Sequence, residues 1–410
     1  MTQSRSKPLT TRDGDKRQAS PKSIYALLAT LLAVLVFVPL ALSNTFYRTI
    51  VFPKCAVLIF GSALVLFMLT LLPALEANWR ERLQVLKSRI VLFVLLYVLS
   101  IGVSTFFGVA RRVSFFGSYD SEMGLVSHVC FLILFVGLIV AIGDDETRLN
   151  VTLGAIALTG LIVAAYSFAQ FAGRDPFLSP SLYTFPSSSG PVLRVPGTLG
   201  HSNYLGNFLL YTTPVTAAFA LASSGSARRI GFAGVALSIA GIVFSGTRGA
   251  WLGLIGGAVV FIVIESRGRE AKARLFSRRN LVSWIAASSI VLVALAVLVI
   301  SPRSRGVLVR ARSFVTDGLT GSGRTILWRD AIKMAPAFAA TGCGPEGFSK
   351  AFLPYKSDEL ARTAPQINNE SSHNGYIDAA ISYGLAGAIL QIAIIALAFA
   401  ILLRARRQAE

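Results

Sequence analysis

The chain has 410 residues, of which 54% are hydrophobic and only 14% are charged, and its mean hydropathy is +0.64. A soluble domain carries about 25% charged residues, so this composition excludes an ordinary soluble protein. The net charge of +19 comes from lysines and arginines in short clusters between apolar runs. That pattern is typical of membrane proteins, so we expect membrane lipid as a partner and no nucleic acid.

About ten apolar runs are long enough to cross a bilayer, because a membrane helix needs about 20 mostly apolar residues. The sequence therefore predicts an all-α fold, a polytopic bundle of transmembrane helices. The spans are expected near residues 23–42, 53–73, 90–108, 125–142, 151–171, 204–222, 230–245, 249–265, 281–301 and 384–403.

These spans divide the chain into five expected regions. Residues 1–22 are polar and too hydrophilic for the start of a cleaved signal peptide, which predicts a disordered cytoplasmic tail. The membrane bundle is expected at 23–301, a loop domain at 302–383 and the last span at 384–403. Residues 404–410 are expected to form a basic cytoplasmic tail.

The basic residues predict the orientation of the bundle. One alternate set of connections, together with both tails, carries most of them, and the positive-inside rule places that side in the cytoplasm. Both termini are then cytoplasmic, as an even number of spans requires. The basic residues that support this orientation are Lys16, Arg17, Lys22, Arg80, Arg82, Lys87, Arg89, Arg228, Arg229, the cluster 267–279, Arg404, Arg406 and Arg407.

The loop at 302–383 is much longer than the connections of about 2–8 residues usual in helical bundles. Loops of that length are usually functional or disordered, and the aromatic residues of this one argue against disorder. Within it, residues 323–334 predict a short amphipathic helix limited by Pro336. Its basic face, with Arg329 and Lys333, fits either lipid headgroups or the solvated surface of a small domain.

Arg248 is an unusual residue, because it stands between two apolar runs with almost no loop. An arginine at the membrane boundary costs a few kcal/mol unless it pairs or reaches the headgroups. Binding a phosphate or diphosphate would explain its place, because the planar guanidinium holds such groups with two parallel hydrogen bonds. The alternative is an arginine at a helix end whose side chain extends to the interface.

The chain has three histidines and three cysteines. His373 lies where the long loop returns to the membrane, and an imidazole can act as a general base near neutral pH. His128 lies in an apolar run and is expected to serve packing, and His201 is expected to have no catalytic role. Cysteines 55, 130 and 343 show no metal-ligand spacing.

Five motifs follow one another between the fifth and the tenth expected span. Together with the long loop before the last span, their order resembles the O-antigen ligase superfamily, which also contains O-antigen polymerases and protein O-oligosaccharyltransferases. The motifs are Arg194 with Gly197-Thr198-Leu199-Gly200-His201-Ser202-Asn203, then Ser245-Gly246-Thr247-Arg248-Gly249, Gly323-Arg324 with Leu327-Trp328, Gly342-Cys343-Gly344 with Gly347-Phe348, and Ser372-His373-Asn374-Gly375-Tyr376.

The resemblance implies that a glycan passes from an undecaprenyl-diphosphate carrier to an acceptor hydroxyl, without metal or cofactor. The reaction would occur at the periplasmic face of a bacterial inner membrane. Arg194 and Arg248 would neutralise the diphosphate leaving group, and His373 would deprotonate or position the acceptor hydroxyl. Further substrate contacts are expected from Arg112, Asn203, Arg324, Arg329 and Asn374.

Several alternatives remain open at this point. The acceptor can be a glycolipid, a second glycan or a protein, since ligase, polymerase and protein transferase share these motifs. A metal-dependent glycosyltransferase would need acidic ligands, for which Asp120 and Glu122 are the clearest pair. A transporter would need a polar path near the bilayer midplane, and the span centres lack acidic residues and lysines.

Overall fold

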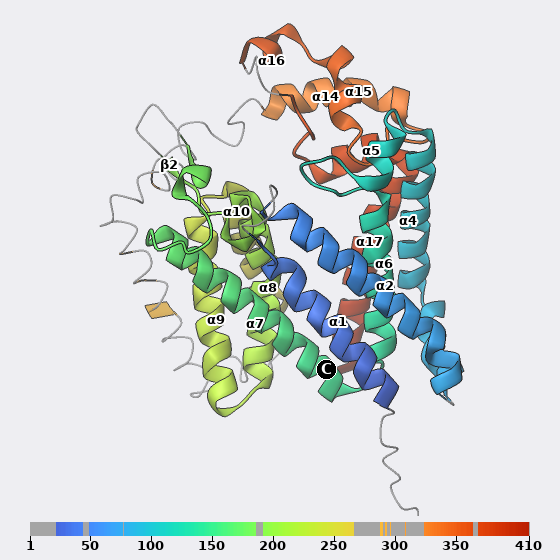
Figure 1. Cartoon of the computed structure of the whole chain (residues 1–410), viewed down its shortest axis with the longest axis vertical. Helices are drawn as coiled ribbons and strands as arrows, with labels where there is room; N and C mark the ends of the chain where they lie inside the picture. Colours follow the sequence, from blue (N-terminus) through green and yellow to red (C-terminus); the bar gives the residue numbers. More distant parts are fainter. Residues whose placement is uncertain are drawn as a thin grey trace, which may run out of the picture.

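The computed structural model describes residues 22–43, 49–76, 78–185, 192–265, 324–363 and 368–409, together with five isolated positions between 288 and 308. This part of the chain is a bundle of long helices with short helices gathered at one end (Figure 1). Eight of the described helices are long and apolar enough to cross a membrane. They are α1 (Lys22–Leu40), α2 (Val51–Leu75), α4 (Arg89–Phe107), α6 (Leu125–Ile142), α7 (Glu146–Phe171), α8 (Ser202–Ala222), α9 (Gly225–Phe244) and α17 (Gly375–Ala409).

These helices confirm the predicted all-α polytopic fold, and each corresponds to one of the expected spans. The expected span 249–265 corresponds to α10 (Arg248–Glu265), although its apolar stretch, Arg248–Phe261, is shorter than in the other eight. The expected span 281–301 lies outside the described residues apart from four isolated positions, as do the tail before Lys22 and most of 302–323.

Large apolar side chains cover the outside of the bundle. Phe60 is 76% exposed, Leu99 62% and Ile389 64%, and many others along the long helices are similarly exposed. A soluble protein rarely exposes so much apolar surface, whereas helices that face lipid carry apolar side chains on their outer surface. The chain is therefore a multi-pass membrane protein.

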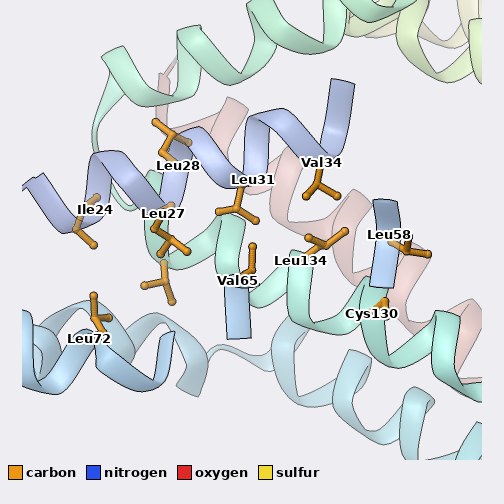
Figure 2. Packing of buried hydrophobic residues seen from close by; sticks show 12 residues of the cluster. Ile24, Leu27, Leu28, Leu31, Val34, Leu58, Val65, Leu72, Cys130 and Leu134 are labelled. Carbon is orange, nitrogen blue, oxygen red and sulfur yellow. The ribbon is translucent and has the colours of Figure 1, made fainter. Parts of the chain in front are cut away.

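Helices α1, α2 and α6 form one core of the bundle. Leu27, Leu31 and Val65 are at most 1% exposed and meet where these helices face one another (Figure 2). Glycine permits the contact: a β-carbon on Gly137 of α6 would come 2.8 Å from Val65 and 3.1 Å from Leu31. Small residues of this kind let membrane helices approach closely, where packing rather than hydrophobicity holds them together.

Helices α7, α8, α9 and α10 contribute to a second core. The rings of Phe171 and Phe244 stack there with centroids 4.4 Å apart, and Leu205 and Leu209 are fully buried beside them. A β-carbon on Gly241 would approach Leu209 to 2.6 Å, so this glycine too is needed for close helix packing. This core holds the start of α8 and the turn before α10, which carry candidate site residues.

One end of the bundle, called the loop end below, carries the connections before α2, α6, α8, α10 and α17 (Figure 1). The short elements at this end are α5 (Arg111–Phe116), η2 (Pro180–Tyr183), β1 (Thr184–Phe185), β2 (Val192–Leu193), η3 (Gly197–Leu199), α14 (Arg324–Phe338), α15 (Phe348–Phe352), η5 (Leu353–Tyr355) and α16 (Asp358–Thr363). Strands β1 and β2 form a small antiparallel ladder that the sequence analysis did not predict.

The opposite end carries α3 (Trp79–Leu83), η1 (Gln84–Lys87) and the basic residues of the chain's C-terminal segment. Asp145 caps α7 there by accepting from the Arg148 backbone N–H at 3.0 Å, and Arg148 Nη1 donates to the Ala141 carbonyl at 2.6 Å. The described basic residues that were expected in the cytoplasm lie in helix ends and connections at this end of the bundle, opposite the loop end. The positive-inside rule continues to predict that this side is cytoplasmic.

Helix α14 packs its apolar face against protein. Leu327, Ala331 and Met334 are at most 3% exposed and join a core with Phe348 and Phe352. Of the two interpretations of this amphipathic helix, the structure therefore favours a small folded subdomain. The helix also continues to Phe338, so the expectation that Pro336 limits it was wrong by two residues. Pro336 lacks the N–H that would bond to the carbonyl of residue 332, which favours an end to the helix, and the helix ends two residues later.

Helix α17 changes direction at Gly384, whose φ of 73° and ψ of 176° are not helical. The break separates its first turns from the long apolar segment. Backbone carbonyl and N–H groups near the break can then form hydrogen bonds with the subdomain. Cys343 N donates to the Ile381 carbonyl at 2.8 Å, Gly344 N to the Ser382 carbonyl at 3.0 Å, and Leu385 N to the Ala339 carbonyl at 2.8 Å. These bonds fix the motif Gly342-Cys343-Gly344 onto α17.

Candidate active site

Arg194 directly follows β2, and the small strand ladder determines its position. Its backbone N–H donates to the Tyr183 carbonyl at 2.9 Å, and its guanidinium carbon lies 5.9 Å from the centre of the Phe185 ring. Nη2 of Arg194 donates to Asn203 Oδ1 at 3.1 Å. Arg194 is thus held between an aromatic ring and the first turn of α8.

The first turn of α8 joins Arg194 to the turn that precedes Arg248. His201 is the N-cap of α8 and accepts from the Asn203 backbone N–H at 3.1 Å. Thr247 Oγ1 lies 3.0 Å from the Ser202 carbonyl and 3.3 Å from Asn203 Oδ1. The amide oxygen of Asn203 is therefore shared by Arg194 and Thr247, and two candidate residues predicted from distant motifs belong to one network.

The turn at 245–247 presents Arg248 at the first position of α10. Gly246 adopts a φ of +62°, which glycine takes without steric cost, and the Thr247 backbone N–H donates to Ser245 Oγ at 3.2 Å. Gly206 of α8 makes room for the turn, because a β-carbon there would lie 3.0 Å from Ser245 Oγ and from Thr247 Cβ. Sequence reasoning singled out Arg248 but missed Gly206.

His373 lies in a tight turn at the start of α17. Its Nδ1 is 3.3 Å from Ser371 Oγ, and its side chain is exposed at the loop end. Asn374 caps α17, since its Oδ1 accepts from the backbone N–H of Tyr376 at 3.1 Å. The predicted substrate-binding role of Asn374 stays a prediction, while the structure gives its side chain this capping contact.

The backbone of His373 is held in the left-handed region, with a φ of 56°. A residue other than glycine rarely adopts this conformation, and it persists only where the surroundings hold it. Here the flanking Ser372 is fully buried: its N–H donates to Asp378 Oδ1 at 2.7 Å and its carbonyl accepts from Trp328 Nε1 at 2.9 Å. These hydrogen bonds therefore hold the backbone that carries the His373 ring in one position. Trp328 and Asp378 are supporting residues for which sequence reasoning proposed no such role.

Tyr204 and two glutamates bring charged and polar groups to the loop end beside the candidate residues. Tyr204, in the first turn of α8, is exposed on the loop end and lies within the electrostatic range of Glu346 and Glu370. Glu346 belongs to the motif after α14, and Glu370 lies three residues before His373. The first turn of α8, which carries Asn203, therefore lies at the same end of the bundle as the subdomain that carries His373.

Glu346 attaches the subdomain to the connection between α5 and α6. Its carboxylate accepts hydrogen bonds from the backbone N–H of Ser118 and, at 3.3 Å, from that of Met123. Burial raises the pKa of the Glu346 carboxyl; the two N–H donors oppose this shift, and the nearby Glu370 adds to it. The sequence analysis did not predict a role for Glu346, because its motif indicates only a glycine-rich turn.

Arg324 and Arg329 lie on α14, in the subdomain. Arg324 is exposed at the first position of the helix. Arg329 Nη2 lies 2.8 Å from Glu359 Oε2, and Nε lies 3.5 Å from Asp330 Oδ1. The structure thus gives Arg329 acidic neighbours within the subdomain, and the substrate roles predicted for both arginines stay predictions.

Arg112 lies apart from Arg194, Arg248 and His373. It lines a cavity of about 550 Å³ between α2, α5 and α6, and none of those three residues lines it. The lining includes Glu122, the acidic residue weighed as a metal ligand, but the described residues contain no group of three or more His, Cys, Asp or Glu that could hold a metal. The structure therefore groups Arg194 with the Arg248 turn and separates Arg112 from them.

The remaining histidine and cysteine of interest have structural contacts. His128 Nδ1 is 2.8 Å from the Gly124 carbonyl and Nε2 is 3.5 Å from the Tyr383 hydroxyl, which fits the packing role predicted for it. Cys343 is fully buried, and this burial raises the pKa of its thiol to about 12. A thiol with so high a pKa stays protonated near neutral pH and is a poor nucleophile.

The fold and this site define a multi-pass membrane protein with an arginine-bearing polar site at one end of its bundle. Residues 233–392 match the sequence profile of the O-antigen ligase family. The predicted resemblance is confirmed over this range, and the match supports membership in the O-antigen ligase superfamily. The matched range includes Arg248 and His373, whereas Arg112, Arg194 and Asn203 precede it.

A protein from Haemophilus influenzae, named only as uncharacterized, is 28% identical over 201 residues. The alignment covers 45% of this chain and 46% of that protein, so the chain spans less than half the length of this relative. No solved structure matches the chain.

Proposed function

We propose that this protein transfers a glycan from an undecaprenyl-diphosphate-linked donor to an acceptor hydroxyl, at the periplasmic face of a bacterial inner membrane and without a metal ion. The observation that carries the proposal is the shared hydrogen-bond network that joins Arg194 to the turn preceding Arg248 through Asn203. Two guanidinium groups at one end of a membrane bundle suit a lipid-linked diphosphate, because they neutralise the charge that develops on it.

In the proposed reaction, the acceptor oxygen attacks the anomeric carbon of the donor sugar. The bond between that carbon and the diphosphate oxygen breaks, and its electron pair leaves with the diphosphate. Arg194 and Arg248 stabilise the leaving group. Because the diphosphate is already a good leaving group, positioning and charge stabilisation are the main tasks of the protein.

His373 receives the proton of the acceptor hydroxyl in this mechanism. The ring is exposed, and its Nδ1 lies beside Ser371 Oγ, so Nδ1–H can donate to that oxygen while Nε2 accepts the proton. The left-handed backbone of His373 supports a functional role, since strained residues concentrate at active sites. Glycolipid, glycan and protein acceptors all satisfy this chemistry, and O-antigen ligation is our leading proposal among them.

Transfer in reconstituted membranes tests the proposal. The assay follows glycan transfer from an undecaprenyl-diphosphate-linked donor to candidate acceptors, with EDTA present. Wild type is expected to transfer, and Arg248→Ala and His373→Ala are expected to lose transfer while remaining folded. Arg174→Ala, which removes an exposed arginine outside the network, is the matched control and should retain transfer. Loss of wild-type transfer in EDTA, or normal transfer by both site variants, would overturn the mechanism.

A further inference from the structure

A second candidate binding site lies at the outer edge of the loop end, separate from the arginine network. The cavity of about 550 Å³ lies between the first turns of α2, helix α5 and the first turns of α6. Cys55 and Ile59 line it from α2, Val126 lines it from α6 and Phe116 lines it from α5. Because Cys55 and Ile59 are four residues apart on one helix, they present a continuous apolar wall.

The cavity lies at the ends of apolar spans, where we expect lipid headgroups to meet the bundle. The spans that surround it begin at Val51 and Leu125, and α5 follows directly after the end of α4 at Phe107. Aromatic side chains are exposed at the same level, including Phe106 at 65%, Phe116 at 61% and Tyr119 at 63%. Aromatic residues gather at the interface between hydrocarbon and water, so this rim is expected to contact headgroups.

Two groups of opposite charge line the same cavity. Arg112 is exposed, and its guanidinium has no hydrogen-bond or ion-pair partner among the described residues, while the neighbouring Arg111 lies 5.4 Å from the Phe106 ring. Glu122 also lines the cavity. A cation and an anion beside an apolar wall match a ligand that carries a phosphate, an ammonium and an acyl chain.

We propose that this cavity binds a zwitterionic aminophospholipid, with its phosphate at Arg112, its ammonium at Glu122 and an acyl chain against Ile59 and Val126. The guanidinium binds the phosphate oxygens through charge-assisted hydrogen bonds, and the carboxylate accepts hydrogen bonds from the ammonium. The proposal rests on the membrane fold and the cavity and does not depend on the transfer reaction.

The cavity also contacts the segment to which the subdomain is attached. Ser118 lines the cavity, and its backbone N–H donates to the carboxylate of Glu346. A lipid seated in the cavity would therefore contact the connection to which the subdomain is attached. Lipid occupancy is expected to stabilise that attachment, which a thermal-unfolding measurement can detect.

Native mass spectrometry of the delipidated full-length protein tests the proposal with three probes: phosphatidylethanolamine, phosphatidylglycerol and undecaprenyl diphosphate. Wild type is expected to retain one phosphatidylethanolamine in preference to phosphatidylglycerol. Arg112→Ala should weaken this binding about tenfold, as expected for loss of a charge-assisted pair. Glu122→Gln should abolish the preference, and Ile59→Trp should block binding by filling the cavity while both charges remain. Arg111→Ala is the control, because Arg111 does not line the cavity.

Three results would overturn the proposal. The first is equal binding of phosphatidylethanolamine and phosphatidylglycerol by wild type, which would remove the role of the ammonium. The second is unchanged binding by both Arg112→Ala and Ile59→Trp. The third is that undecaprenyl diphosphate displaces the phospholipid, and that Arg112→Ala abolishes this displacement while Arg248→Ala does not. The cavity would then hold the isoprenoid diphosphate. Failure of the transfer assay alone would leave these binding results intact.

Discussion

Arg194 donates a hydrogen bond from Nη2 to Asn203 Oδ1 at 3.1 Å, and the same oxygen lies 3.3 Å from Thr247 Oγ1. One amide oxygen thereby joins the segment after β2 to the turn before α10. Arg194 follows a strand and Arg248 begins a helix, so the relative placement of these two segments depends in part on Asn203.

Replacing Asn203 with alanine removes this shared acceptor. A hydrogen bond to a charged group contributes about 1.5–3 kcal/mol, so we expect glycan transfer by Asn203→Ala to fall by about tenfold or more. Asn207→Ala is the matched control, because Asn207 is an exposed asparagine one turn further along α8. Initial transfer rates at saturating donor provide the comparison, and equal rates for the two variants would contradict the role assigned to Asn203.

Gly206→Ala tests whether the turn carrying Arg248 needs its close contact with α8. The new β-carbon would lie 3.0 Å from Ser245 Oγ and 3.1 Å from Ala250 Cβ, so the turn must shift. We expect a clear loss of transfer with a loss of stability of about 1–3 kcal/mol, as for other overpacked sites. Gly256→Ala meets no described atom within 4 Å and should behave as wild type in both measurements.

Asp330 should make the stability of the subdomain depend on pH. Burial opposes its charge, but hydrogen bonds from Ser357 and Lys333 outweigh burial and hold the pKa of this carboxyl below its usual value. A lowered pKa in the folded state contributes stability above the unfolded-state pKa of about 4, which is lost as pH falls through the folded-state pKa. Thermal unfolding should therefore show wild type losing stability in acid.

Asp330→Asn removes this charge and should flatten the acid limb of the stability curve. At neutral pH the variant is expected to lose about 1–3 kcal/mol, because an amide cannot accept all of the hydrogen bonds made to the carboxylate. Glu359→Gln is a useful comparison, since Glu359 makes an exposed ion pair with Arg329 and should cost less than about 1 kcal/mol. An identical pH profile for wild type and Asp330→Asn would refute the assignment.

Gly384 should be required for the break in α17. Alanine there would have to adopt a φ of +73°, and its β-carbon would lie 3.0 Å from the Ala339 carbonyl oxygen. Such strain costs about 1–3 kcal/mol, so Gly384→Ala should lower the unfolding temperature and loosen the subdomain that presents His373. Gly102→Ala in α4, with no described atom within 4 Å of the new β-carbon, should leave the unfolding temperature near that of wild type.

The long helices could be predicted from sequence because apolar length alone identifies a span. The prediction 384–403 even begins at the residue where α17 breaks, since hydropathy rises only after Gly384. The bounds at polar ends were less accurate: α9 begins at Gly225 rather than near 230, because its basic first turn is helical but not apolar. Arg228 in that turn is only 5% exposed.

The arrangement of the site was harder to predict than its members. The motifs named Arg194, Asn203 and Arg248, but the bonds that join them depend on long-range packing that no local pattern encodes. Glu346 and Trp328 act through backbone partners more than 40 residues away, Ser118 and Ser372, which explains why sequence reasoning gave them no supporting role. Arg112 was expected to contact substrate, and the structure places it in a cavity that neither Arg194 nor Arg248 lines.

The central claim is that the arginines hold the diphosphate and His373 acts on the acceptor, so binding and turnover should separate. The most direct measurement is the affinity of the full-length protein for undecaprenyl diphosphate, determined beside the transfer rate for wild type, Arg194→Ala, Arg248→Ala, His373→Ala and Arg174→Ala. We predict that the two site-arginine variants lose binding and transfer, that His373→Ala binds like wild type but does not transfer, and that Arg174→Ala retains both. Normal diphosphate affinity in both site-arginine variants, or normal transfer by His373→Ala, would contradict the account.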